Sequence, residues 1–253
     1  MLLSQVKPLS LHNEKLIVIL GATATGKSAL ALRMAEELQT EIISADSMMV
    51  YKNFNIGTAK PSLEELKRIK HHLVDILEPE EKFSVADFQA AAAKIITDLN
   101  NQGKIPIVAG GTGLYIQALI EGYKFKNAED VDDCGKVKKS LLSHFKETGR
   151  LVYDVKVIGL TLDRQELYRR INERTQKMFD NGLVDEVKSL LDSGVSRNAQ
   201  AMLGIGYKET LEYIDGKITL EETINKISQA TRNFAKRQFT WYKRMKYIDW
   251  QLP

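Results

Sequence analysis

Short, mostly apolar runs alternate with longer amphipathic stretches over most of the chain. Runs of this length are typical of strands buried on both faces of a parallel sheet, and the stretches between them repeat with helical spacing. The alternation predicts an α/β fold in which helices flank a parallel sheet. We expect strands at residues 16–20, 41–45, 105–109 and 155–160, and the start of another at 71–76.

Several expected helices have a recognisable first residue. Ser62, Ser84 and Asp163 are of the kind that caps a helix N-terminus, and each precedes a helical stretch. After the last expected strand, helical patterns dominate, so the C-terminal part is predicted to be helical. We expect its helices near residues 183–191, 208–214 and 220–246.

The first apolar run leads into a glycine-rich motif, G-x-x-x-x-G-K-[ST]. A helical pattern follows it through Leu30, Met34 and Leu38, so the motif lies between a strand and a helix. Backbone N–H groups and the positive end of the helix dipole then converge on one point, which suits a nucleotide or another diphosphate. The prediction becomes a P-loop NTPase-like parallel sheet. The expected diphosphate-binding residues are Gly21, Ala22, Thr23, Ala24, Thr25, Gly26, Lys27 and Ser28, with Lys27 on the terminal phosphate and Ser28 holding Mg²⁺.

Two more groups of polar residues follow expected strands. Asp46 comes directly after residues 41–45, and Thr112 lies in the Gly-rich turn after residues 105–109. Ligands of open parallel sheets bind beyond the carboxyl ends of strands, so both residues should share a crevice with the P-loop. Asp46 is then either a reacting carboxylate or a support for Mg²⁺ or Lys27. The turn lacks the aspartate that orders Mg²⁺ in nucleotide-hydrolysing P-loop proteins, which argues against an ATPase.

Composition narrows the class of protein. The 253 residues carry a formal net charge of +3 and one cysteine, Cys134, which excludes an internal disulfide and favours a reducing compartment. Adjacent His71 and His72 would point to opposite faces of a strand, which favours packing or local hydrogen bonds over a shared metal. Residues 1–14 lack a signal-peptide pattern, and no apolar run approaches membrane-spanning length. We expect a cytoplasmic monomer with no membrane contact.

Cations and aromatic residues are interleaved on the last expected helix. Such a helix suits an RNA backbone with unstacked bases, and the alternative is a packing helix with a basic outer face. The helix after Asp163 leaves a similar choice between a phosphate clamp and a solvated face. The residues concerned are Arg232, Phe234, Lys236, Arg237, Phe239, Trp241, Tyr242, Lys243, Arg244 and Lys246 on the last helix, and Arg164, Arg169, Arg170 and Arg174 on the earlier one.

A stretch of acidic and then basic residues interrupts the α/β pattern between residues 124 and 153, and is typical of a solvated connector with a short helix. We therefore divide the chain into the first part of the P-loop core at residues 1–123, a connector at 124–153, and residues 154–253, which complete the core and add the basic C-terminal helices.

With these segments placed, the chain resembles the tRNA dimethylallyltransferase family, also called tRNA isopentenyltransferases. The resemblance covers most of residues 16–123 and 155–250, and its combination of motifs is specific among P-loop families. Besides the P-loop, the matching stretches are Ile43-Ser44-Ala45-Asp46-Ser47-Met48, Val50-Tyr51, Ile56-Gly57-Thr58-Ala59-Lys60-Pro61, His71-His72-Leu73, Phe83-Ser84-Val85-Ala86-Asp87-Phe88, Gly110-Gly111-Thr112-Gly113-Leu114-Tyr115, Gly206-Tyr207-Lys208 and Ala235-Lys236-Arg237-Gln238-Phe239-Thr240-Trp241.

The resemblance implies transfer of a dimethylallyl group from dimethylallyl diphosphate to the exocyclic amine of the adenosine just 3′ of the anticodon in tRNA, with release of pyrophosphate. It implies Asp46 as general base, Lys27 with Mg²⁺ as stabiliser of the leaving group, and Thr112 as a substrate contact. The implied tRNA-binding residues are Asp46, Ser47, Met48, Met49, Thr112, Gly206, Tyr207, Lys208, Lys236, Arg237, Gln238 and Trp241.

The chain departs from the family at three places. Ala22 stands where members usually have proline, and Met49 stands where they usually have glutamine, near the target base. The family also has a sizeable helical insertion that grips the anticodon stem-loop, whereas only residues 124–153 occupy that place here.

Three other functions stay open. Prenylation of a free adenine nucleotide would suit the short connector, but it would not need the basic aromatic helix. A small-molecule kinase would use ATP in the same P-loop, but it should have an Arg-rich lid, and residues 124–150 contain only Arg150. A non-catalytic RNA-binding protein would leave Asp46 and Lys27 idle.

Overall fold

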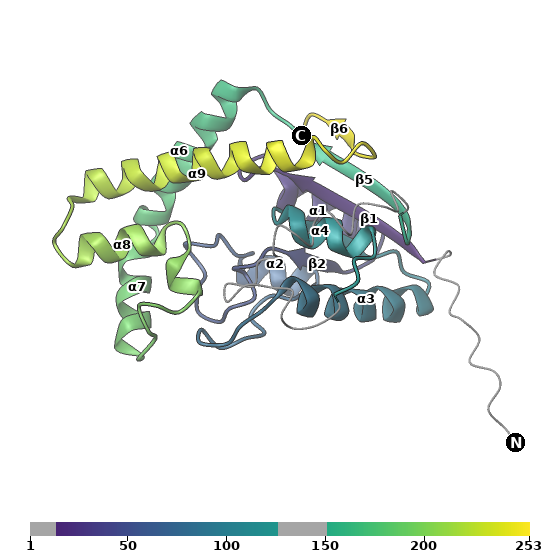
Figure 1. Ribbon diagram of the computed structural model, residues 1–253, viewed down its shortest axis with the longest axis horizontal. Helices are drawn as coiled ribbons and strands as arrows, with labels where there is room; N and C mark the ends of the chain where they lie inside the picture. The colour runs from purple at the N-terminus through teal and green to yellow at the C-terminus, as the bar shows by residue number, and fades with distance from the viewer. Residues whose placement is uncertain (1–13, 126–150) are drawn as a thin grey trace, which may run out of the picture.

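The computed structural model describes residues 14–125 and 151–253. In this part of the chain, parallel strands form one sheet in the order β3-β2-β4-β1-β5-β6 (Figure 1). The predicted α/β class and the expected parallel sheet are confirmed. The strands are β1 Lys15–Gly21, β2 Ile42–Ala45, β3 His71–His72, β4 Ile107–Gly110, β5 Asp154–Leu160 and β6 Asp249–Gln251.

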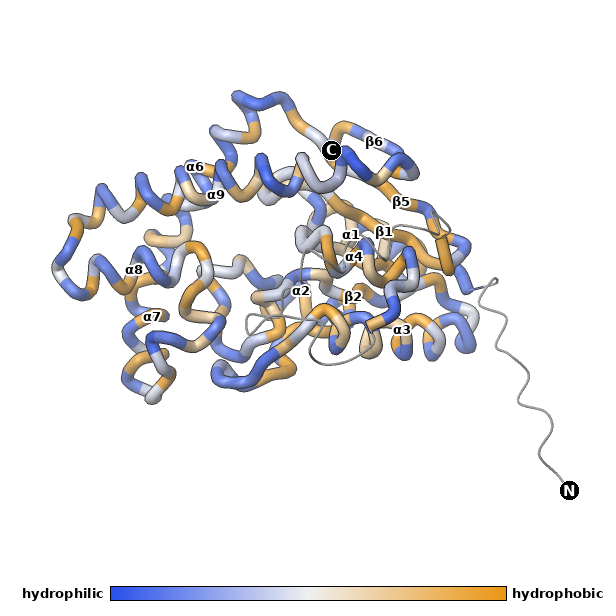
Figure 2. The backbone as a smooth tube through the Cα atoms, viewed as in Figure 1, coloured by the Kyte–Doolittle hydropathy of each residue, from blue (hydrophilic) through white to orange (hydrophobic). Residues whose placement is uncertain are grey.

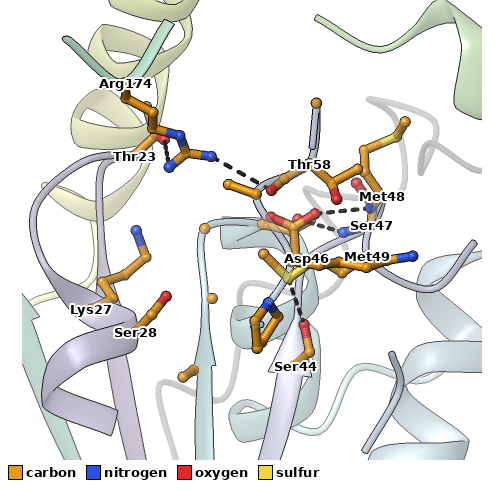
Figure 3. A pocket seen from close by; sticks show the side chains of 18 of the residues that line it. Thr23, Lys27, Ser28, Ser44, Asp46, Ser47, Met48, Met49, Thr58 and Arg174 are labelled. Carbon is orange, nitrogen blue, oxygen red and sulfur yellow. Dashed lines mark hydrogen bonds between the residues drawn. The ribbon is translucent and has the colours of Figure 1, made fainter. Parts of the chain in front are cut away.

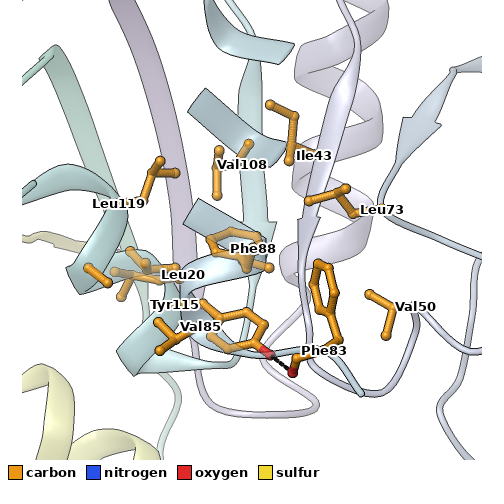
Figure 4. Close-up of a cluster of buried hydrophobic side chains, with 14 of the residues drawn as sticks. Leu20, Ile43, Val50, Leu73, Phe83, Val85, Phe88, Val108, Tyr115 and Leu119 are labelled. Carbon is orange, nitrogen blue, oxygen red and sulfur yellow. Dashed lines mark hydrogen bonds between the residues drawn. The ribbon is translucent and has the colours of Figure 1, made fainter. Parts of the chain in front are cut away.

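Helices cover both faces of the sheet because the side chains of each strand alternate between the faces. Val18 and Leu20 of β1 pack in the larger core, with helices α3 (Val85–Asn101) and α4 (Gly113–Ile120), as Figure 4 shows for part of it. Ile19 points to the other face, against helix α1 (Lys27–Glu37). A strand buried on both sides must be apolar throughout, which is the pattern that the sequence shows.

The expected N-caps are confirmed. Ser62 and Ser84 each form a capping box, with Glu65 at the start of α2 (Leu63–Arg68) and with Asp87 at the start of α3. The Asp163 side chain accepts hydrogen bonds from the backbone at the start of α6 (Arg164–Asp180). These side chains satisfy backbone N–H groups that a helix start otherwise leaves unpaired.

The C-terminal part is helical, as predicted, and extends to one side of the sheet (Figure 1). Its long helix α9 contacts α6, α8, α4 and β1, and so joins the helical part to the sheet. In Figure 2 its polar and apolar residues alternate along its length, as expected for a helix with one buried face. The remaining elements are α7 Leu183–Asp192, the 3₁₀ turn η2 Ala201–Leu203, α8 Tyr207–Ile214 and α9 Leu220–Tyr242.

Two details of the sequence prediction are wrong. The strand expected at 71–76 ends after His72, because Leu73 and Asp75 have positive φ angles of 60° and 54°. The last helix ends at Tyr242 rather than near 246, and β6 after it was not predicted.

The helix expected after the P-loop is present as α1. Its buried residues are Ala31, Leu32 and Ala35. Small residues there let the helix lie close to the sheet. In the described ranges, 14–125 and 151–253, no helix is long and apolar enough to cross a membrane.

One carboxylate ties the helical part to a loop of the sheet part. Glu186, in the first turn of α7, accepts hydrogen bonds from the backbone N–H groups of Asn55 (2.9 Å), Ile56 (2.8 Å) and Gly57 (3.3 Å). It also accepts one from the Tyr207 hydroxyl at 2.7 Å. Successive N–H groups that converge on one anion form a compact binding nest, so Glu186 holds this loop in place.

We expect Glu186→Gln to lower the free energy of unfolding by about 1–3 kcal/mol, because an amide –NH₂ would face donors that a carboxylate oxygen now satisfies. Urea denaturation followed by circular dichroism measures this. Asp185→Asn is the matched control, since Asp185 lies in the same first turn of α7 and is exposed. Equal losses in the two variants would show that only the helix dipole is involved.

Candidate active site

A cavity of about 450 Å³ lies beyond the carboxyl ends of β1, β2 and β4. Figure 3 shows part of its lining, with P-loop side chains on one side and the residues after β2 on the other. As predicted, Asp46 and Thr112 share it with the P-loop. Its lining includes Thr23, Lys27, Ser28, Asp46, Ser47, Met48, Met49, Thr58, Gly111, Thr112, Arg174, Tyr207, Phe234 and Gln238.

Strand register explains why these groups meet. Gly110 of β4 pairs with Ala45 of β2 on one side and with Leu20 of β1 on the other. The chain therefore leaves the three strands at one level. The P-loop follows β1, the Asp46 loop (the residues directly after β2) follows β2, and the Gly-rich turn follows β4. Gly110 must be glycine, because an added Cβ would lie 2.2 Å from the Ala45 carbonyl oxygen.

The P-loop bends closely around its own backbone. Gly26, at the start of α1, has a φ of 93°, a conformation that glycine adopts easily. Thr25 Oγ1 and Lys27 Nζ both donate to the Ala22 carbonyl oxygen, at 2.8 and 2.7 Å. The ammonium group thus lies over the loop, at the start of the helix, where an anion binds favourably.

Lys27 has an unusual environment for a cation. Burial and the nearby Arg174 guanidinium lower its pKa to about 7, and the Asp46 carboxylate only partly opposes them. Burial also lowers the pKa of Arg174. Lys27 and Arg174 face one cavity and repel each other, with Asp46 across from them, so a multiply charged anion would relieve the repulsion.

Arg174 is the arginine of α6 that turns toward the cavity. Its guanidinium donates to Thr23 Oγ1 at 3.1 Å and, more weakly, to the Thr58 carbonyl oxygen at 3.5 Å. The surface arginines Arg169 and Arg170 pair instead with Glu166. The helix therefore has both a cavity-facing arginine and a solvated face, and nothing in the sequence pattern marked Arg174 as the inward residue.

Asp46 is held by its own loop and by the neighbouring strand end. Its Oδ1 accepts a hydrogen bond from the Met48 N–H at 2.9 Å. Thr112 Oγ1 accepts one from the Ser47 N–H at 3.2 Å, and the Thr112 N–H donates to the Ala45 carbonyl oxygen at 3.1 Å. The carboxylate is thereby fixed at the mouth of β2, with Thr112 beside it.

The expected RNA-contacting residues fall into two groups. Lys208, Lys236 and Arg237 are exposed. Tyr207 and Gln238 are buried, with only 1% and 6% of their surfaces exposed, and both line the cavity. Gly206, buried like Tyr207, is the N-cap of α8.

The aromatic residues of α9 mostly face the protein. Trp241 packs so closely on Gly113 that an added Cβ there would lie 2.6 Å from its ring, and Tyr242 is fully buried. Phe239 packs beside a small cluster that includes Ala22. Only Phe234 among these rings lines the cavity in the described structure, and the expectation that rings of this helix receive RNA bases stays a prediction.

Both adjacent histidines form hydrogen bonds, of which only that of His71 is local along the chain. His71 Nδ1 lies 2.8 Å from the Ile69 carbonyl oxygen, and His72 Nε2 lies 2.7 Å from Glu41. Within residues 14–125 and 151–253, no group of three or more His, Cys, Asp or Glu side chains could hold a metal ion. The connector, which contains Cys134, lies mostly outside the described residues.

Comparison with known proteins agrees with this geometry. A family model described as IPP transferase matches residues 49–150 and 131–245. A tRNA dimethylallyltransferase of Anoxybacillus flavithermus is 41% identical, over 94% of this chain and 90% of its own length. One from Carboxydothermus hydrogenoformans is 42% identical, over 94% and 92%. The Anoxybacillus alignment spans 280 positions, more than the 253 residues present here, so the relative has residues that this chain lacks.

Solved structures that resemble this chain have names of the same kind as the relatives found by sequence. The full-length tRNA isopentenylpyrophosphate transferase from Bacillus halodurans has a TM-score of 0.82 at 38% identity, over 94% of this chain and 89% of that one. A eukaryotic dimethylallyltransferase described as acting on tRNA has a TM-score of 0.75 at 25% identity, over 90% and 70%. With a P-loop, a carboxylate and a buried arginine in one cavity, and with these matches along nearly its whole length, the chain belongs to the IPP transferase family.

Proposed function

We propose that this protein transfers a dimethylallyl group from dimethylallyl diphosphate to the exocyclic amine of the adenosine 3′-adjacent to the anticodon in tRNA, and releases pyrophosphate. One observation carries the proposal: Lys27, Arg174 and Asp46 line the same cavity. The cations suit a leaving diphosphate, and the carboxylate suits a proton acceptor. The names of the relatives support tRNA over a free nucleotide as the acceptor.

The leaving group needs stabilisation of negative charge. As the C–O bond to the diphosphate breaks, charge grows on the departing oxygens, and the Lys27 ammonium and Arg174 guanidinium lie where they can neutralise it. An arginine can form two parallel hydrogen bonds to a phosphate group, which also orients it. The two cations are positioned before the reaction, so little reorganisation is needed as the bond breaks.

The acceptor amine needs to lose a proton. Its nitrogen forms the new bond to the first prenyl carbon, and the proton then moves to the Asp46 carboxylate. The Met48 N–H and the Thr112–Ser47 contact hold the Asp46 loop in place for this step. Thr112 is close enough to the same loop to contact the incoming base.

Mg²⁺ fits this site through Ser28. The Ser28 hydroxyl is exposed to the cavity at the start of α1, and Mg²⁺ in phosphate sites commonly keeps several waters and needs few protein ligands. The absence of an acidic metal cluster among the described residues is therefore compatible with it. When bound, the ion would neutralise charge on the diphosphate oxygens.

The proposed RNA surface is the outer side of α9, with Lys236 and Arg237, together with Lys208 of α8. Residues 124–153 would replace the larger insertion of the family between the two parts of the core. We propose that one chain suffices, because the cavity and these cations belong to the same chain.

The first test offers labelled dimethylallyl diphosphate and Mg²⁺ to unmodified tRNA and AMP side by side. We expect label in tRNA, and a loss of about 10²–10⁴-fold in rate for Asp46→Asn, because the amide keeps the hydrogen bond to Met48 but accepts no proton. Pyrophosphate binding should be unchanged. Label in AMP alone would identify a nucleotide prenyltransferase, and near wild-type turnover by Asp46→Asn would remove the base from the mechanism.

A second prediction concerns pH. Lys27, which faces Arg174 and Asp46, has a pKa of about 7 that a bound diphosphate should raise. Below pH 7 the ammonium is already charged, whereas above it binding requires proton uptake. We expect the affinity for Mg-pyrophosphate to fall by up to about tenfold per pH unit above 7, relative to Lys27→Arg, which stays charged throughout. Titration calorimetry measures the ratio, which cancels ionisation of the ligand; a flat ratio would contradict the low pKa.

A third prediction concerns RNA. The double change Lys236→Ala and Arg237→Ala should weaken tRNA binding and reduce the slope of log K against log salt by about 1–2, because two phosphate contacts are lost. Fluorescence anisotropy with an anticodon stem-loop measures it. The control is Arg33→Ala with Lys94→Ala, which removes two exposed cations from α1 and α3. An equal change in both double variants would show that only net charge matters.

A further inference from the structure

A buried amide on α9 bridges two of the loops that form the cavity. Gln238 Oε1 accepts a hydrogen bond from the Thr23 N–H of the P-loop at 2.9 Å, and Nε2 donates to the Gly111 carbonyl oxygen at 2.8 Å. The residue is only 6% exposed. An amide is suited to this place because it has an acceptor at one end and a donor at the other.

The contact with the Gly-rich turn is reinforced by the same face of α9. Tyr242, one helical turn after Gln238, donates its hydroxyl proton to the same Gly111 carbonyl oxygen at 2.8 Å. An added Cβ at Gly111 would lie 2.5 Å from Gln238 Nε2, so the turn approaches the amide as closely as a glycine permits. Two hydrogen bonds from α9 to the Gly111 carbonyl oxygen therefore hold this turn against the helix.

From the turn, hydrogen bonds continue to the carboxylate loop. Thr112 follows Gly111 directly and bonds to both Ala45 and Ser47, the two residues on either side of Asp46. The P-loop, the Gly-rich turn and the Asp46 loop are thus joined in one series, and Gln238 is the link between the first two. On the outer side of α9, the neighbouring residues Lys236 and Arg237 are exposed.

We infer that Gln238 is a positioning residue for the transfer step: its amide fixes the P-loop relative to the turn that carries Thr112 and adjoins Asp46. The inference rests on the proposed function, in which the P-loop holds the leaving diphosphate and the Asp46 side receives the amine. Gln238 touches neither reacting atom. It sets the distance between the P-loop, which holds the diphosphate, and the Asp46 side of the cavity, which receives the amine. The rate of a bimolecular step is very sensitive to such a distance.

If Gln238 is a positioning residue, replacing it should slow the transfer step and leave diphosphate binding nearly unchanged. Gln238→Met keeps the side-chain length and removes both hydrogen bonds. We expect the single-turnover rate with both substrates saturating to fall by about 10–100-fold, as for a misplacement of about 1 Å. Binding of Mg-pyrophosphate should stay within about threefold of wild type, because Lys27 and the remaining P-loop amides are untouched.

The matched control is Gln229→Met, which changes the same residue type on the exposed side of the same helix, where Gln229 bonds to Asn233 and Arg232. Gln238→Glu serves as a second variant if Gln238→Met does not fold. It keeps an acceptor for the Thr23 N–H but loses the donor to Gly111, so its rate should also fall below that of Gln229→Met.

A rate for Gln238→Met within twofold of the Gln229→Met rate would overturn the inference, as would pyrophosphate affinity that falls in step with the rate, because Gln238 would then only shape the P-loop. Failure of the wild-type protein to label tRNA would instead refute the proposed function, and that result is obtained before any variant is made.

Discussion

The site depends on the parallel register of β2, β4 and β1. Ala45, Gly110 and Leu20 lie side by side, so the chain leaves the three strands at one level. Parallel strands all point the same way, and their following loops must gather at one edge of the sheet. The P-loop, the Asp46 loop and the Gly-rich turn therefore lie together, although they are far apart along the chain. A glycine at position 110 is part of the same constraint, since the neighbouring backbone leaves no room for a Cβ.

On this edge the charges are arranged asymmetrically. Lys27 and Arg174 face the cavity from the P-loop and from α6, and Asp46 lies across from them after β2. Burial and, second to it, the neighbouring Arg174 guanidinium lower the pKa of Lys27, so its ammonium is costly to keep charged until an anion binds. Charge placed in advance where a diphosphate will carry its growing negative charge stabilises a transition state more effectively than charge that must move there.

Helix α9 serves both the interior and the surface. Its buried side contributes Gln238 and Tyr242 to the Gly-rich turn, and Trp241 packs on Gly113. Its exposed side carries Lys236 and Arg237. A single rigid helix therefore connects the proposed RNA surface to the backbone of the cavity. Glu186 plays a comparable part on the other side of the cavity, where it holds the loop at residues 55–57 against α7 and α8.

The sequence by itself determined β1, β2, β4 and β5, the capped helices, the P-loop and the placement of Asp46 and Thr112 at strand ends, because these depend on local periodicity, on cap chemistry and on the direction of parallel strands. Only the tertiary structure decided the rest. Arg174 could not be told from its neighbours on α6, nor Gln238 from an exposed RNA contact, because helical spacing does not say which neighbour covers a given side chain. Strand β6 and the nest around Glu186 exist only through partners that are distant along the chain.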